Sequence, residues 1–310
     1  MNIRRIHSFF VPGRIPLILL VLIFILFRFL NSENKNDLEL WGLIAMQIGI
    51  VSLLLYLNQT FIIVRNHTLL PAFFYLLFTG INPMYHYTWI SGIVSLSVLL
   101  FFILLFTASL QSYPQGNAFN MAFILTLTSF VWQPLLFFFP LLWFGLSNFH
   151  GLNFRSFFAS ITGFVVIYLF IFTGSIYWDD SLAIFIEKLP DFQSLFQFRF
   201  LKELTQQEYI TIGTLFILFI MAGINIFVWN ISENTKTIIS LSFLYIITFL
   251  IFIVLLLQTQ WKNEWFSILC IPLSLLVSHL FSKPHRRIII WIMLLTIIFF
   301  LAMPLLPLFE

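Results

Sequence analysis

The stretch "WFSILCIPLSLLVSHLFSKPHRRIIIWIMLLTIIFFLAMP" occupies residues 265–304. Two apolar runs, at 265–281 and 288–306, flank the basic segment "SKPHRR" at 282–287. A helix needs about 20 mostly apolar residues to cross about 30 Å of hydrocarbon, so each run has close to the length of one transmembrane helix. The basic segment is typical of a cytoplasmic loop, because short loops rich in Lys and Arg stay on that side of a membrane.

Composition extends this interpretation to the whole chain. Of its 310 residues 61% are hydrophobic and only 9% are charged, and the mean hydropathy is +1.02. A soluble chain carries roughly a quarter of charged residues, so the solvent for most of this chain is lipid. The net charge of +3 is small and scattered, which argues against nucleic acid as a partner. Cys270 is the single cysteine, so an internal disulfide and a zinc cluster are excluded.

The same length criterion predicts an all-α fold, a polytopic transmembrane helical bundle with about 11 membrane segments and at least about nine. Residues 1–310 are expected to form a single integral membrane domain. The pair 118–131 and 134–147 is too short for ordinary spans, and it fits either two short helices or a re-entrant hairpin. The predicted segments are 15–30, 41–62, 71–87, 89–110, 118–131, 134–147, 156–176, 209–229, 237–257, 265–281 and 288–306.

The distribution of bases predicts a cytoplasmic N-terminus and a non-cytoplasmic C-terminus in the cell inner (plasma) membrane. With this orientation nine of the fifteen Lys and Arg residues are cytoplasmic. Eleven of the twelve carboxylates then fall on the outer side, with Glu233 as the exception, although they played no part in choosing the orientation. The cytoplasmic bases are Arg4, Arg5, Arg14, Arg65, Arg155, Lys236, Lys283, Arg286 and Arg287.

The largest outer loop covers residues 177–208 and holds six of the twelve carboxylates. Phenylalanines alternate with charges on both sides of Pro190. This pattern predicts two short amphipathic helices that lie on the outer leaflet and are separated at Pro190. An irregular loop that packs on the ends of its own spans is the alternative.

The predicted spans carry no Asp, Glu, Lys or Arg near their centres. Intramembrane charges mark ion pathways and proton relays, so their absence argues against ion-coupled transport. The polar residues that remain are expected to make interhelical hydrogen bonds. They are Gln47, Asn120, Gln133, Asn225 and His279.

Three outer loops carry the candidate site. Asp37 and Glu39 in the first loop are the candidate catalytic residues, because a carboxylate can accept a proton from an incoming hydroxyl. Cations beside them would stabilise a departing phosphate. The candidate substrate-binding residues are Arg28, His86, Asp179, Asp180, Arg199 and Lys202. No metal site is predicted, and the cofactor is unknown.

Six of these eight residues also have a structural interpretation. Asp37 and Glu39 fit a solvated turn, and Arg28 fits a side chain that extends to the headgroups. His86 lies between two tyrosines of an aromatic belt, and Asp179 and Asp180 follow Trp178 where a span leaves the membrane.

Residues 117–164, "NAFNMAFILTLTSFVWQPLLFFFPLLWFGLSNFHGLNFRSFFASITGF", resemble a family of uncharacterised polytopic inner-membrane proteins of Bacteroidetes. The likeness rests on Asn120, Pro134, Arg155 and Gly163, and on the N-terminal stretch "SFFVPGRIPLILLVLIFILFRF". More distantly, the chain is similar to C-superfamily membrane glycosyltransferases, which have many spans and an acidic residue in the first outer loop. Asp37 or Glu39 would be that residue. The short first outer loop departs from the pattern of those enzymes.

Three functions remain open from the sequence. The first is cell-envelope biogenesis on polyprenyl-linked sugar or phosphate substrates at the outer leaflet, with a glycosyltransferase-like activity if the protein is an enzyme. The second is a non-catalytic subunit or scaffold of an envelope complex, with membrane proteins as partners. The third is a transporter of lipids or solutes without ion coupling. Membrane lipids are expected partners in all three.

The predicted orientation can be measured by thiol labelling. Single cysteines that replace Asp179 and Arg286, in a variant with Cys270→Ser, should react from opposite sides of the membrane. An impermeant maleimide applied to intact cells is expected to label position 179 and to spare position 286. Labelling of both positions from the same side would contradict the orientation.

Overall fold

The computed structural model describes residues 14–31, 38–64, 68–80, 87–177, 204–229, 235–282 and 287–303. These residues form eleven α-helices and three short helices of other types, and they contain no β-strand, as the sequence predicted. The interfacial helices predicted on both sides of Pro190 lie outside the described residues. The chain divides into two compact units, which are residues 1–92 with 200–310, and residues 93–199. We call them unit 1 and unit 2. The expected single membrane domain stays a prediction.

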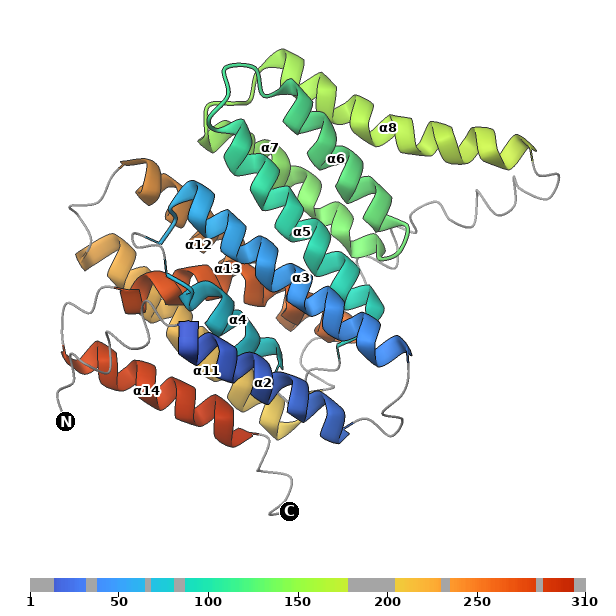
Figure 1. Cartoon of the computed structure of the whole chain (residues 1–310). Helices are drawn as coiled ribbons and strands as arrows, with labels where there is room; N and C mark the ends of the chain where they lie inside the picture. The colour runs from blue at the N-terminus through green and yellow to red at the C-terminus, as the bar shows by residue number, and fades with distance from the viewer. Residues whose placement is uncertain are drawn as a thin grey trace. The chain divides into compact units, whose positions relative to one another are not determined.

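Unit 1 contains most of the helices in Figure 1. The short helix η2 is a π-helix and η3 is a 3-10 helix. In chain order the elements are α2 (Arg14–Asn31), α3 (Leu38–Phe61), α4 (Leu70–Gly80), α11 (Gln206–Ile224), η2 (Asn225–Trp229), α12 (Thr235–Leu257), η3 (Thr259–Trp261), α13 (Lys262–Ser282) and α14 (Arg287–Ala302).

Unit 2 begins within α5 (Trp89–Ala108), whose first four residues belong to unit 1. The remaining elements are α6 (Gln115–Ser129), the 3-10 helix η1 (Gln133–Phe137), α7 (Phe138–Asn148) and α8 (Phe154–Tyr177).

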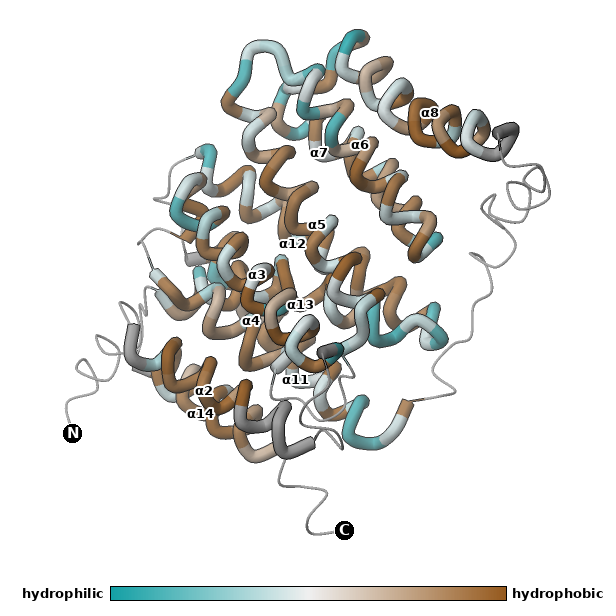
Figure 2. Tube along the Cα trace, turned by 45° about the vertical axis from the view of Figure 1, so that its right-hand side comes forward, coloured by the Kyte–Doolittle hydropathy of each residue, from teal (hydrophilic) through white to brown (hydrophobic). Residues whose placement is uncertain are grey.

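Six helices are long and apolar enough to cross a membrane, and Figure 2 shows hydrophobic residues along much of their length. This supports a membrane protein, but the predicted count of about 11 segments is not confirmed. The helix α4 has 11 residues, α7 has 11 and α6 has 15, and each is shorter than the hydrocarbon layer. The six segments are Glu39–Phe61, Trp89–Ala108, Phe154–Gly174, Gln206–Val228, Thr235–Leu257 and Thr259–Ser282.

The core of unit 1 is the pair α4 and α13. Every residue of α4 is buried, and so is every residue of α13 from Trp265 to Ser282. The ring centroids of Phe74 and Phe281 lie 5.3 Å apart, and those of Phe78 and Phe300 lie 5.1 Å apart. The start of α4 therefore contacts the end of α13, and the end of α4 contacts the end of α14. The helices α2 and α3 also contact α4, while α11, α12 and α14 contact α13.

Buried serines on α13 satisfy their own hydroxyl groups. Ser274 donates to the carbonyl of Ile271, and Ser278 and Ser282 donate to the carbonyls of Ser274 and His279. Because these bonds close within the helix, α13 can be surrounded by apolar side chains without leaving these hydroxyls unsatisfied.

In unit 2 the helix α8 packs closely on α6 at Gly163. A Cβ atom at this position would lie 2.5 Å from the carbonyl oxygen of Phe119 and 3.2 Å from the Cβ atom of Ala122. Ala118 and Ala122, four residues apart on α6, are both fully buried. Small residues at such spacing let two membrane helices approach closely without a polar contact.

We expect substitution of Gly163 to separate α6 from α8. Gly163→Ala should destabilise the protein by about 1–3 kcal/mol, because the new methyl group meets backbone rather than a mobile side chain. Gly174→Ala on the same helix is the matched control, since a Cβ atom there meets nothing within 4 Å. Thermal unfolding in detergent measures both variants. Equal stability of the two would contradict the close contact at Gly163.

Candidate functional site

Three helices of unit 1, α3, α11 and α13, begin at the same end of the unit as the first four residues of α5, which also belong to unit 1. Gly42 in the first turns of α3 lies against the ring of Trp89, the first residue of α5. Ser267 in α13 donates to the carbonyl of Ser91 at 3.4 Å. An ion pair then joins the starts of α11 and α13. We call this end the α3–α5–α11–α13 end.

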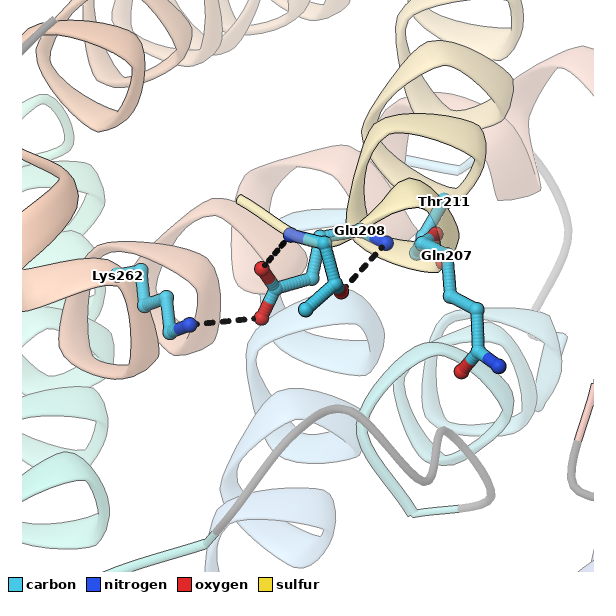
Figure 3. A network of polar contacts seen from close by, with 5 residues as sticks. Gln207, Glu208, Thr211 and Lys262 are labelled. Atoms are coloured by element: carbon cyan, nitrogen blue, oxygen red, sulfur yellow. Dashed lines mark hydrogen bonds and ion pairs between the residues drawn. The ribbon is translucent and has the colours of Figure 1, made fainter. Parts of the chain in front are cut away.

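The ion pair connects Glu208 and Lys262, whose Oε1 and Nζ atoms lie 2.9 Å apart (Figure 3). The other carboxylate oxygen of Glu208 accepts a hydrogen bond from the backbone of Thr205 at 2.8 Å. The hydroxyl of Thr205 accepts from the backbone of Glu208 in return, which completes a capping box. One side chain thus starts α11 and fastens it to α13. Glu208 is the last residue of the predicted outer loop 177–208.

A second polar group surrounds the start of α13. The indole of Trp265 donates to Oε1 of Gln258 at 3.1 Å, and both side chains are buried. Glu264 is half-buried in the first turn of α13. No described cation forms an ion pair with Glu264. Glu264 therefore retains a carboxylate that can accept a proton or a donor from a ligand.

The charges at this end differ in their availability. Glu208 and Lys262 bind each other, although 37% of the Lys262 side chain stays exposed. Glu39 is exposed in the first turn of α3. Among the described residues no group of three His, Cys, Asp or Glu side chains could hold a metal ion. The chemistry that this end offers is proton acceptance by carboxylates, next to one exposed ammonium group.

Most of the predicted site residues lie outside the described residues. Glu39 is described, and Arg28 is placed on α2, but the side chain of Arg28 is not described. The starts of α3, α5 and α11 lie at one end of unit 1. Each of these helix starts follows one of the three predicted outer loops. The assignment of each residue stays a prediction. The undescribed residues are Asp37, His86, Asp179, Asp180, Arg199 and Lys202.

Gln258, Lys262 and Glu264 were not among the site residues predicted from the sequence. All three belong to "QTQWKNEW" at 258–265. There one base, one acid and two tryptophans interrupt an otherwise apolar region. This mixture of aromatic and charged residues between two spans was the available signal. Its relation to Glu208 could not be found from spacing, because the two segments are about 50 residues apart.

The expected interhelical hydrogen bonds are confirmed for two buried amides. Gln47 on α3 donates from Nε2 to the hydroxyl of Thr79 on α4 at 3.0 Å. Asn225 at the start of η2 lies with Nδ2 3.3 Å from Nδ1 of His279 on α13. Asn120, by contrast, is exposed on α6.

The chain belongs to the family of unknown function DUF6427, whose model matches residues 3–308. No curated protein and no solved structure matches the chain. This match supports the predicted membership in an uncharacterised family. It does not support the link to Bacteroidetes or to glycosyltransferases.

The Glu208–Lys262 contact gives a graded prediction for stability. Lys262→Met should cost about 0.2–1 kcal/mol, because the ion pair is partly exposed. Glu208→Ala should cost about 0.5–2 kcal/mol, because the capping box is lost as well. Lys236→Met, at an exposed lysine, is the control. The measurement is thermal unfolding in detergent, and the contact would be refuted if Lys262→Met and Lys236→Met behaved alike at low and at high salt.

Proposed function

We propose that this protein is a bacterial inner-membrane protein of cell-envelope biogenesis that acts on polyprenyl-linked sugar or phosphate substrates. The α3–α5–α11–α13 end is the proposed site, on the outer leaflet, with the N-terminus cytoplasmic and the C-terminus on the outer side. The observation that carries this proposal is the gathering of four helix starts with two carboxylates, Glu39 and Glu264, that no described cation neutralises.

Exposed aromatic residues support a position of this end at the lipid headgroups. Trp41, Trp89 and Tyr209 are 53%, 41% and 45% exposed, and each lies in the first turn of its helix. Near the opposite end Tyr56 of α3 and Trp291 of α14 are also exposed. Aromatic rings with a polar edge concentrate at the two membrane–water interfaces, so these two levels are consistent with the membrane boundaries.

The chemistry proposed is transfer of a glycosyl group from a polyprenyl-phosphate donor. The bond between the anomeric carbon and the phosphate oxygen breaks, and the phosphate leaves with the electron pair. The hydroxyl oxygen of the acceptor bonds to the anomeric carbon, and its proton passes to Asp37 or Glu39. Arg28, Arg199 and Lys202 would stabilise the phosphate, and His86, Asp179 and Asp180 would bind the sugar hydroxyls.

A non-catalytic subunit of an envelope complex is the second candidate. The observation in its favour is the surface of α8, where Phe154, Phe158, Leu169 and Phe170 are 78%, 47%, 53% and 71% exposed. Such a surface can contact a helix of another protein in the membrane as well as lipid.

Lipid analysis after depletion of the protein tests the proposed function. A polyprenyl-linked intermediate should accumulate, and the double variant Asp37→Asn, Glu39→Gln should fail to restore growth or lipid composition. Glu33→Gln, in the same loop, is the control and should restore both.

Full complementation by the double variant would contradict the catalytic proposal. An unchanged lipid profile together with a stable partner in affinity purification would favour the subunit instead.

A further inference from the structure

The end of unit 1 opposite to the α3–α5–α11–α13 end carries a buried polar pair, Asn225 and His279. Asn225 is 1% exposed and His279 is 2% exposed. The amide nitrogen of Asn225 lies 3.3 Å from Nδ1 of His279, and it donates there when the imidazole hydrogen is on Nε2. The amide oxygen of Asn225 is buried and has no hydrogen-bond partner. In an apolar bundle such an oxygen is retained at a cost, which points to a use.

The backbone at this position is also unusual. Asn225 is the first residue of η2, a five-residue π-helix that ends α11. π-helical turns are rare and occur frequently at functional sites, because they add a residue to a helix and redirect a side chain. Two independent features, the bare amide oxygen and the π-helix, therefore coincide at Asn225.

The pair lies close to the ends of its helices. Asn225 is four residues before the end of η2, and His279 is three residues before the end of α13. At about 1.5 Å per residue, both lie roughly one turn from the helix ends. In the proposed orientation this is the depth at which acyl chains meet headgroups. Ile224, Phe227 and Val228 on the same turns are 43%, 56% and 58% exposed, so lipid reaches the neighbouring surface.

The missing partner is a hydrogen-bond donor, because a carbonyl oxygen only accepts. At this depth the donors of a lipid are a free glycerol hydroxyl or an amide N–H. Lys236, the exposed second residue of α12, stands at the same end and supplies a positive charge for a phosphate. We propose that Asn225, held by His279, recognises the hydroxyl or amide N–H of a phosphate-bearing membrane lipid at this end of unit 1.

Two probes that differ in one hydrogen-bond donor test this site. Lysophosphatidic acid has a free hydroxyl on its glycerol, and its 2-O-methyl ether with the same acyl chain has none. Native mass spectrometry of the full-length protein should show about two- to tenfold tighter binding of the free-hydroxyl lipid, as expected for one hydrogen bond. Asn225→Leu should abolish this preference.

Gln47→Leu is the matched control. Among the described residues of unit 1, Gln47 is the other amide whose buried oxygen lacks a partner, and it lies on α3, where it donates to Thr79 of α4. The preference should persist in this variant. If Asn225→Leu fails to purify as a folded protein, Asn225→Gln replaces it, since a longer side chain moves the oxygen and should also remove the preference. Equal binding of both lipids by the unchanged protein would overturn the proposal. So would an Asn225 variant that still binds the free-hydroxyl lipid more tightly.

Discussion

Burial of α13 from Trp265 to Ser282 is the constraint on which the rest of unit 1 depends. A helix surrounded on all sides must close its own backbone hydrogen bonds and must present no unsatisfied hydroxyl to its neighbours. The serines of α13 meet this requirement by donating to carbonyls within the helix. The helix α4 is equally buried against it, and the helices α2, α3, α11, α12 and α14 then pack around the pair.

This arrangement explains where the polar side chains of unit 1 lie. Between the two ends the buried polar contacts are neutral, as in the bond from Gln47 to Thr79. Charges such as Glu208 and Lys262 occur where helices begin, within reach of water and headgroups. The two ends also differ in kind, because one carries the carboxylates Glu39, Glu208 and Glu264 and the other carries a buried amide and imidazole. A protein that contacts different lipid groups at its two surfaces would need such a difference.

The apolar runs predicted helix positions well, because helix formation in lipid follows from length and hydropathy alone. The helix α5 at Trp89–Ala108 and α8 at Phe154–Tyr177 lie within two residues of the expected spans. Of the run at 71–87, the residues up to Gly80 belong to the 11-residue helix α4, and this length does not confirm a full span. The π-helix at Asn225 left no signal in the pattern of residues. The partners of Gln47, Asn225 and Glu208 were also hidden, because they depend on tertiary contacts between distant segments.

Cross-linking of α4 to α13 in membranes tests the packing of the buried pair most directly. Cysteines would replace Phe74 and Phe281, whose ring centroids lie 5.3 Å apart, in a variant with Cys270→Ser and a protease site within residues 178–203. After reaction with a short bifunctional thiol reagent that contains a reducible bond, followed by proteolysis, the two fragments should remain joined until a reductant is added. The control carries cysteines at Phe74 and Trp265, and Trp265 lies at the other end of α13 from Phe281. Its two fragments should separate. Fragments that separate without reductant in the 74–281 variant would contradict the proposed core.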